Sequence, residues 1–115
     1  MTAAAHGLRA WLLQRFTAAY LAAFVLYLII RLGGGAPASF QAWHHWLAGP
    51  WVNLAAALFL VSLLGHAWVG VRDVIMDYVR PSGLRVSVMA AVGLFLIGMG
   101  AWGLRLLFLV AWRGA

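Results

Sequence analysis

Long apolar segments alternate with short polar or glycine-rich stretches along the chain. The uninterrupted apolar segments cover residues 16–30, 51–71 and 86–104. As helices, the first and third would be about 22 and 28 Å long, so the first crosses the roughly 30 Å hydrocarbon core only if its flanking arginines reach the headgroups. The pattern predicts an all-α membrane protein of one domain, residues 1–115, with transmembrane helices over about 9–31, 51–73 and 86–112.

Helix-breaking residues separate these segments. Three glycines and a proline lie within residues 33–37, and Pro-Ser-Gly at residues 81–83 forms the second turn. Pro50 suits the first turn of the second helix. Three tryptophans surround the start of that helix, as in an interfacial aromatic belt: Trp43, Trp46 and Trp51. We expect His44 and His45 to lie in this Trp-rich loop and to contact solvated headgroups.

Composition and charge exclude several classes of protein. The chain has 115 residues, of which 66% are hydrophobic and 9% charged, against about a quarter charged in soluble domains. So small a chain cannot bury this much apolar surface in water, and a disordered chain would be poor in it. The eight arginines are scattered singly, which argues against binding to nucleic acid. Without cysteine there is no disulfide, thiolate metal site or redox thiol, so an electron-transfer role would need a bound cofactor.

The arginines also predict an orientation in the membrane. Three spans put the N-terminus and the second turn on one side, which carries five arginines: Arg9, Arg15, Arg72, Arg80 and Arg85. The opposite side carries three: Arg31, Arg105 and Arg113. Because cytoplasmic loops are enriched in positive charge, we expect the N-terminus to lie in the cytoplasm.

His66 lies deep in the second span, where an ionisable residue is a functional hypothesis by default. At about 100° per residue, Ser62, Asp73 and Asp77 fall within about 40° of its direction, and Gly70 shares that face. A flat cofactor lying against this face would need such a gap beside its ligand. Two interpretations remain open from the spacing: His66 ligates a cofactor, or it hydrogen-bonds to a carbonyl or hydroxyl of a neighbouring helix.

Further polar residues lie near the predicted cytoplasmic ends of the helices. Asp73 and Asp77 are like charges four residues apart, which repel unless one is protonated or arginines intervene. Two interpretations are open: the two aspartates form a solvated cluster at the membrane interface, or they serve as a docking surface or a route for protons. Tyr78 is an interfacial anchor or a donor to a carbonyl oxygen. Arg15 binds lipid phosphate or pairs with the carboxylate of an anionic cofactor.

Two sequence blocks resemble a known family. His66-Ala67-Trp68-Val69-Gly70-Val71-Arg72, followed by Asp77-Tyr78-Val79-Arg80-Pro81, is similar to the small membrane anchor of bacterial succinate dehydrogenase, the D subunit. The resemblance covers nearly the whole chain and includes Arg15-Phe16-Thr17-Ala18 at the first helix. The larger C subunit usually has a second histidine just after the arginine. This chain has Asp73 at that position, which favours the D subunit.

The resemblance implies a haem b shared with the partner anchor, the C subunit, with one axial histidine from each chain. His66 matches the D-subunit ligand to the iron, and Ser62, one turn earlier, is a candidate to orient its other ring nitrogen. The family also binds ubiquinone at the cytoplasmic mouth. Tyr78 matches the tyrosine that donates to a quinone carbonyl, and Asp77 matches the adjacent acid. Arg15 matches an arginine near the haem propionates.

The resemblance further implies a subunit that is not catalytic alone. It would anchor the flavoprotein and iron–sulfur subunits to the bacterial inner membrane and take part in electron transfer from succinate to quinone. Three alternatives stay open at this point. They are a haem b anchor of fumarate reductase or another respiratory complex, a small proton-conducting protein that uses the His66–Asp77 face, and a structural anchor without haem.

Overall fold

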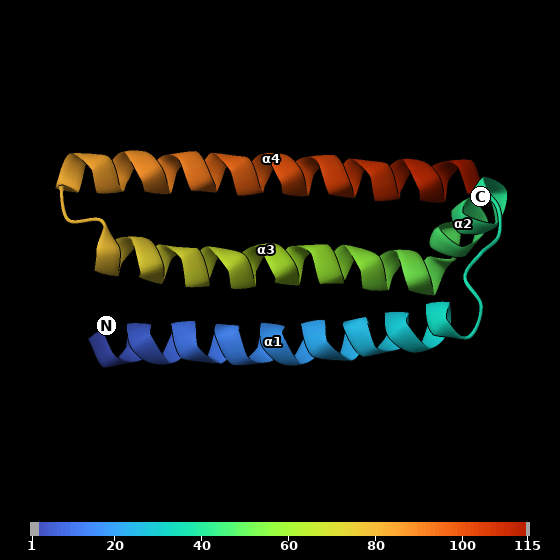
Figure 1. Ribbon diagram of the computed structural model, residues 1–115, viewed down its shortest axis with the longest axis horizontal. Coiled ribbons are helices and arrows are strands. Elements are labelled where there is room, and N and C mark those ends of the chain that lie inside the picture. The colour runs from blue at the N-terminus through green and yellow to red at the C-terminus, as the bar shows by residue number, and fades with distance from the viewer. Residues whose placement is uncertain (1–2, 115) are drawn as a thin grey trace.

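Four helices form the computed structural model of the chain, which describes residues 3–114 and the side chains of residues 7–113. They are α1 (Ala3–Gly33), α2 (Phe40–Ala48), α3 (Pro50–Tyr78) and α4 (Ser82–Gly114), and these residues contain no strand. α3 runs antiparallel to α1 and α4, and the short α2 lies at the end where α4 finishes (Figure 1). The three long helices are long and apolar enough to cross a membrane, and each contains one predicted span. The predicted all-α fold with three long apolar helices is confirmed.

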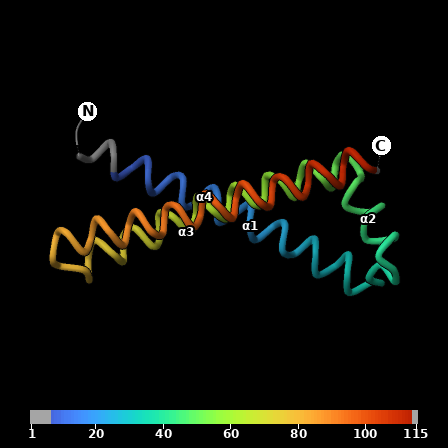
Figure 2. The backbone as a smooth tube through the Cα atoms, turned by 90° about the horizontal axis from the view of Figure 1, so that it is seen from above, coloured from blue at the N-terminus to red at the C-terminus, as the bar shows by residue number. Residues whose placement is uncertain are grey.

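α3 is the central helix of an open layer. α1 and α4 each pack against α3, but no Cα atoms of α1 and α4 approach within 8 Å over the described residues. α3 and α4 run close together, and α1 crosses this pair obliquely (Figure 2). The interior is therefore small, and the only buried side chains among those described are Thr17, Phe24, Val69 and Ile75. Both faces of the layer present apolar side chains to lipid or to other chains.

Aromatic side chains and one hydroxyl hold α1 against α3. Phe24 stacks on Phe59 with the ring centroids 4.6 Å apart. Tyr20 Oη donates a hydrogen bond of 2.6 Å to the carbonyl oxygen of Ala55. A stacked aromatic pair contributes about 0.5–1.5 kcal/mol beyond the area that it buries. These contacts, from the C-terminal half of α1, fix the register in which α1 crosses α3.

Close approach and one amide hold α3 against α4. A Cβ atom added at Gly103 would lie 2.5 Å from Leu60 Cδ2, so the absence of a side chain lets the two helices approach. Asn53 Nδ2 donates to the carbonyl oxygens of Leu107 in α4, at 2.9 Å, and of Leu47 in α2, at 3.1 Å. One side chain of α3 therefore ties together three helices at this end of the molecule.

The Trp-rich segment expected as a loop contains a helix. α2 begins after Ser39, whose hydroxyl accepts a hydrogen bond of 3.1 Å from the backbone N–H of Ala42. A serine at this position stabilises a helix start by satisfying one of its free N–H groups. Gly49 alone joins α2 to α3. The loop assignment of His44 and His45 was wrong, because the N-cap and this short connection accommodate a helix.

Candidate functional site

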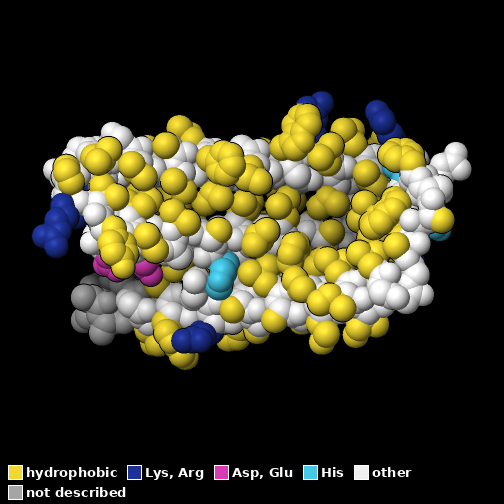
Figure 3. Space-filling view, in the orientation of Figure 1, with side chains coloured by type: hydrophobic (Ala, Val, Ile, Leu, Met, Phe, Trp, Pro, Cys, Tyr) yellow, Lys and Arg dark blue, Asp and Glu magenta, His cyan; other side chains and the backbone are white. Residues whose placement is uncertain are grey.

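His66 lies near the middle of α3, on the side that faces α1. Its ring atom Nδ1 is 3.1 Å from Thr17 Oγ1. The imidazole is half-buried, whereas Thr17 is 9% exposed and is the one polar side chain described as buried. A histidine is visible on the open face of the layer, over the contact between α1 and α3 (Figure 3). One ring nitrogen is thus held within this chain, while part of the ring stays accessible from outside.

Thr17, and not Ser62, is the hydrogen-bond partner of His66. Ser62 lies one turn before His66, but within the described part of the chain the ring nitrogen Nδ1 forms its hydrogen bond with the threonine. The expectation for Ser62 was therefore wrong, since helix crossing brings a hydroxyl of α1 to the edge of the ring. Sequence reasoning missed Thr17 because its partner is 49 residues away. A hydroxyl on a long apolar helix was the available signal.

The polar face predicted for the second span is preserved, because α3 is a continuous helix from Pro50 to Tyr78. Asp77 lies on the His66 side of the helix, about 17 Å further along its axis. Tyr78 leaves the helix about 120° from His66, so it does not share that face. Gly70 faces α1: a Cβ atom added there would lie 3.9 Å from Gln14 Nε2. A Cβ atom at Gly70 would thus make only an ordinary van der Waals contact with α1, and the crossing of the two helices does not depend on the glycine.

The acidic residues and Tyr78 lie at the end of α3 that is next to the start of α1. Acidic side chains are visible at this end of the layer (Figure 3). Asp73 pairs with Arg72 at 3.5 Å, and both side chains are exposed, so the pair stabilises the fold by little. Asp77 is exposed and makes no ion pair among the described residues, and Tyr78 is 80% exposed. These groups are available to a ligand, water or another chain.

Arg15 and His66 are not brought together within this chain. On α1, Arg15 precedes Thr17 by two residues, which turns its side chain about 160° away from the hydroxyl that contacts His66. The guanidinium lies over the Trp11 ring, with Cζ 5.5 Å from the ring centroid. Arg15 is exposed and has no acidic partner in the described region. It presents a positive charge to the surroundings of the layer.

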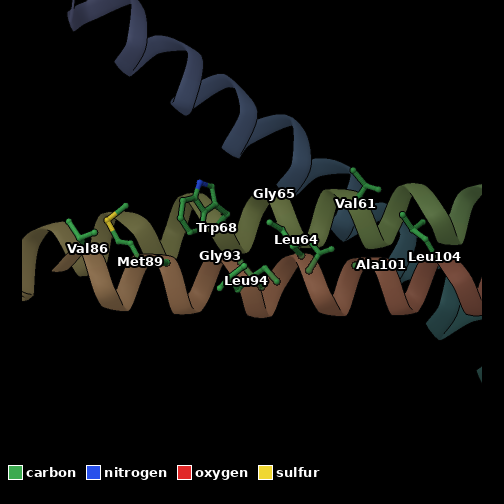
Figure 4. Close-up of a pocket in the computed structure, with 14 residues that line it drawn as sticks. Val61, Leu64, Gly65, Trp68, Val86, Met89, Gly93, Leu94, Ala101 and Leu104 are labelled. Carbon is green, nitrogen blue, oxygen red and sulfur yellow. The ribbon is translucent and has the colours of Figure 1, made fainter. Parts of the chain in front are cut away.

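An apolar groove of about 1180 Å³ lies between α3 and α4. Leu64 and Trp68 line it from α3, and Gly93 and Leu94 line it from α4 (Figure 4). Leu64 and Trp68 leave α3 about 160° from His66. The groove therefore opens on the opposite side of α3 and is separate from the His66 site.

The residues around His66 fit a haem shared between two chains better than a metal site within one chain. No cluster of three or more histidine, cysteine or acidic side chains able to hold an ion occurs in the described residues. A haem held between two chains, with one histidine from each, would need only a single accessible imidazole here. The ring of His66 meets this requirement, because Thr17 binds one nitrogen and the open layer leaves room for a second chain.

Comparison with known proteins gives two findings. A family model described as succinate dehydrogenase/fumarate reductase transmembrane subunit matches residues 1–101. The succinate dehydrogenase hydrophobic membrane anchor subunit of Coxiella burnetii (strain RSA 493 / Nine Mile phase I) is 28% identical over 104 residues, which cover 90% of this chain and 90% of that protein. The similarity therefore includes all three long helices.

Proposed function

Because this chain belongs to the succinate dehydrogenase/fumarate reductase transmembrane subunit family, we propose that it is the D-type anchor of a succinate dehydrogenase. As a membrane anchor it is a non-catalytic, multi-pass subunit of an enzyme complex. In this role it binds the iron–sulfur and flavoprotein subunits to the bilayer and pairs with a second, C-type membrane anchor. The open layer supports that pairing, since apolar surface on both its faces needs lipid or a partner.

His66 would hold a haem b between the two anchors through one ring nitrogen, and the partner anchor would supply the other ligand. The observation that carries this proposal is the half-buried imidazole at mid-span, with one nitrogen on Thr17 and an accessible side on the open face. Metal-binding histidines characteristically use their second nitrogen in this way. When bound, haem b supplies a one-electron redox centre. Arg15, exposed and without an acidic partner in the described region, neutralises a propionate.

Asp77 and Tyr78 form this chain's part of a ubiquinone site at the cytoplasmic mouth. Reducing a quinone to a quinol consumes two electrons, supplied by the iron–sulfur subunit, and two protons. The Tyr78 hydroxyl donates a hydrogen bond to a quinone carbonyl oxygen and holds the ring there. The Asp77 carboxyl takes protons from cytoplasmic water and passes them towards the quinone oxygens. The exposure of both side chains at one end of α3 supports this assignment.

The haem assignment is tested by replacing His66 with alanine in the purified complex. We expect the H66A complex to lose the reduced-minus-oxidised absorbance of haem b, because one of the two axial ligands is removed. Ser62→Ala is the matched control, since Ser62 lies one turn away on the same helix and forms no hydrogen bond with the ring among the described residues. An H66A complex with unchanged spectrum and haem content would remove His66 as the ligand.

A further inference from the structure

We propose that Thr17 is a positioning residue for His66, and that its hydroxyl oxygen accepts the Nδ1–H of the imidazole and leaves Nε2 free as the ligand atom. This inference rests on the proposed function, because it concerns the same histidine. It adds a residue of α1 to a site whose ligand comes from α3. It also assigns the tautomer of His66, which spacing along the sequence does not determine.

The hydrogen-bond partners of Thr17 determine the direction of its bond to His66. Thr17 Oγ1 lies 2.7 Å from the carbonyl oxygen of Leu13 and 3.1 Å from that of Gln14. Carbonyl oxygens only accept, and a threonine hydroxyl has one proton to donate. The shorter distance assigns this proton to Leu13. With its proton on this bond, the hydroxyl oxygen can only accept from His66. The 3.1 Å hydrogen bond between the two side chains is therefore donated by Nδ1–H to Oγ1.

Packing holds the acceptor oxygen in place. Thr17 is 9% exposed, so water does not compete for its lone pairs. A β-branched side chain that bonds the carbonyl four residues earlier is restricted to few rotamers. The stacking of Phe24 on Phe59 and the bond from Tyr20 to Ala55 keep α1 in register with α3. The imidazole is therefore oriented by a second helix as well as by its own.

A fixed Nδ1–H···O bond has two consequences for a ligand histidine. Exchanging the roles of the two nitrogens would bring the lone pair of Nδ1 against the lone pair of Oγ1, unless the hydroxyl gave up its bond to the carbonyl oxygen of Leu13. Hydrogen bonding by Nδ1–H also makes Nε2 a stronger electron donor, which favours ferric over ferrous iron. Removing the acceptor should therefore weaken haem retention and raise the haem midpoint potential.

The test compares Thr17→Val, which keeps the branched shape without an acceptor, with Thr17→Ser, which keeps the hydroxyl. The readouts on the purified complex are haem content, haem midpoint potential and the low-spin ferric EPR signal. For T17V we expect about tenfold weaker haem retention, a more positive potential and a shifted EPR signal. T17S should stay close to wild type, as should the control Ser62→Ala.

Two outcomes separate this inference from the proposed function. If H66A loses the haem while T17V matches wild type in all three readouts, the positioning role of Thr17 is overturned and the ligand assignment stands. If H66A keeps the haem, the ligand assignment itself fails. Should T17V not assemble, the ¹⁵N spectrum of histidine-labelled, reduced wild-type complex decides. A protonated, hydrogen-bonded Nδ1 on His66 supports the inference, and an unprotonated Nδ1 contradicts it.

Discussion

His66 shows how this chain accommodates an ionisable group at membrane depth. A polar side chain in the hydrocarbon region costs free energy unless it finds a partner, and Thr17 supplies one at 3.1 Å. The hydroxyl is bonded in turn to the backbone of its own helix. Asp77 and Tyr78 have no such partner within the described region and are exposed. The polar residues of α3 therefore differ in role. His66 has a hydrogen-bond partner within this chain, whereas Asp77 and Tyr78 form an exposed pair at the end of the helix.

Tyr78→Phe tests the proposed role of the exposed pair in quinone binding. If Tyr78 donates to a quinone as proposed, loss of the hydroxyl removes one hydrogen bond worth on the order of 1–1.5 kcal/mol, so quinone reduction should fall by about tenfold. Succinate oxidation by an artificial acceptor that bypasses the membrane should be largely retained. Both activities are measured on the same purified complex, with Tyr27→Phe on α1 as the control. A parallel fall in both activities would indicate defective assembly instead of altered quinone binding.

At the scale of the elements, Asn53 links three helices at one end of the layer, because this residue of α3 is hydrogen-bonded to both α2 and α4. Its amide donates to a carbonyl of α2 and to a carbonyl of α4. Hydrogen bonds between helices in membranes contribute on the order of 1 kcal/mol each. Close packing at Gly103 supports the same pair of helices. Hydrogen bonds from Asn53 and close packing at a glycine together hold α3 against α4, because two apolar helices in lipid have no hydrophobic driving force to associate.

Asn53→Leu should loosen this end of the molecule. The substitution keeps the approximate volume but removes both hydrogen bonds, so we expect a loss of about 1–2 kcal/mol in the free energy of unfolding. An SDS titration of the complex followed by circular dichroism measures the change. Ser87→Ala is the matched control, because the Ser87 hydroxyl bonds only to the carbonyl of Gly83 in an exposed turn of its own helix. Equal SDS unfolding midpoints for N53L and wild type would show that the hydrogen bonds of Asn53 do not stabilise the fold.

The whole molecule has two chemically different ends. The start of α1 and the α3–α4 turn lie at one end, and α2 and the end of α4 lie at the other (Figure 1). Both acidic residues and five of the eight arginines belong to the first end or its flanking turns. The excess of arginine favours a cytoplasmic position for that end. The quinone residues would then lie beside the soluble subunits.

Reporter fusions test this orientation. Alkaline phosphatase, which is active only outside the cytoplasm, should be active when fused after residue 113 and inactive when fused in the turn at residues 79–81. Green fluorescent protein at the same positions should give the reverse pattern, because it fluoresces only in the cytoplasm. An active phosphatase in the turn would invert the topology and move Asp77 and Tyr78 to the opposite side.

The sequence by itself determined what local periodicity and transfer free energy control. Long apolar segments must be helices that span the bilayer, because unpaired backbone groups are too costly there. Since α3 is one regular helix, the shared face of His66 and Asp77 followed directly from 3.6 residues per turn. The helix at residues 40–48 was missed, because a short helix depends on its cap and neighbours more than on its apolar pattern.

Only the tertiary structure decided which helices touch and which side chains meet. It made α3 the central helix, chose Thr17 in place of Ser62 as the partner of His66, and turned Arg15 away from that contact. Spacing turns Arg15 away from Thr17, but only the tertiary contact between Thr17 and His66 shows that this also turns Arg15 away from the histidine. The central place of α3 and the choice of Thr17 do not follow from spacing along the chain, because each depends on the angle and register at which two helices cross. In lipid those quantities are set by close packing and a few interhelical hydrogen bonds, which leave no periodic signal in the sequence.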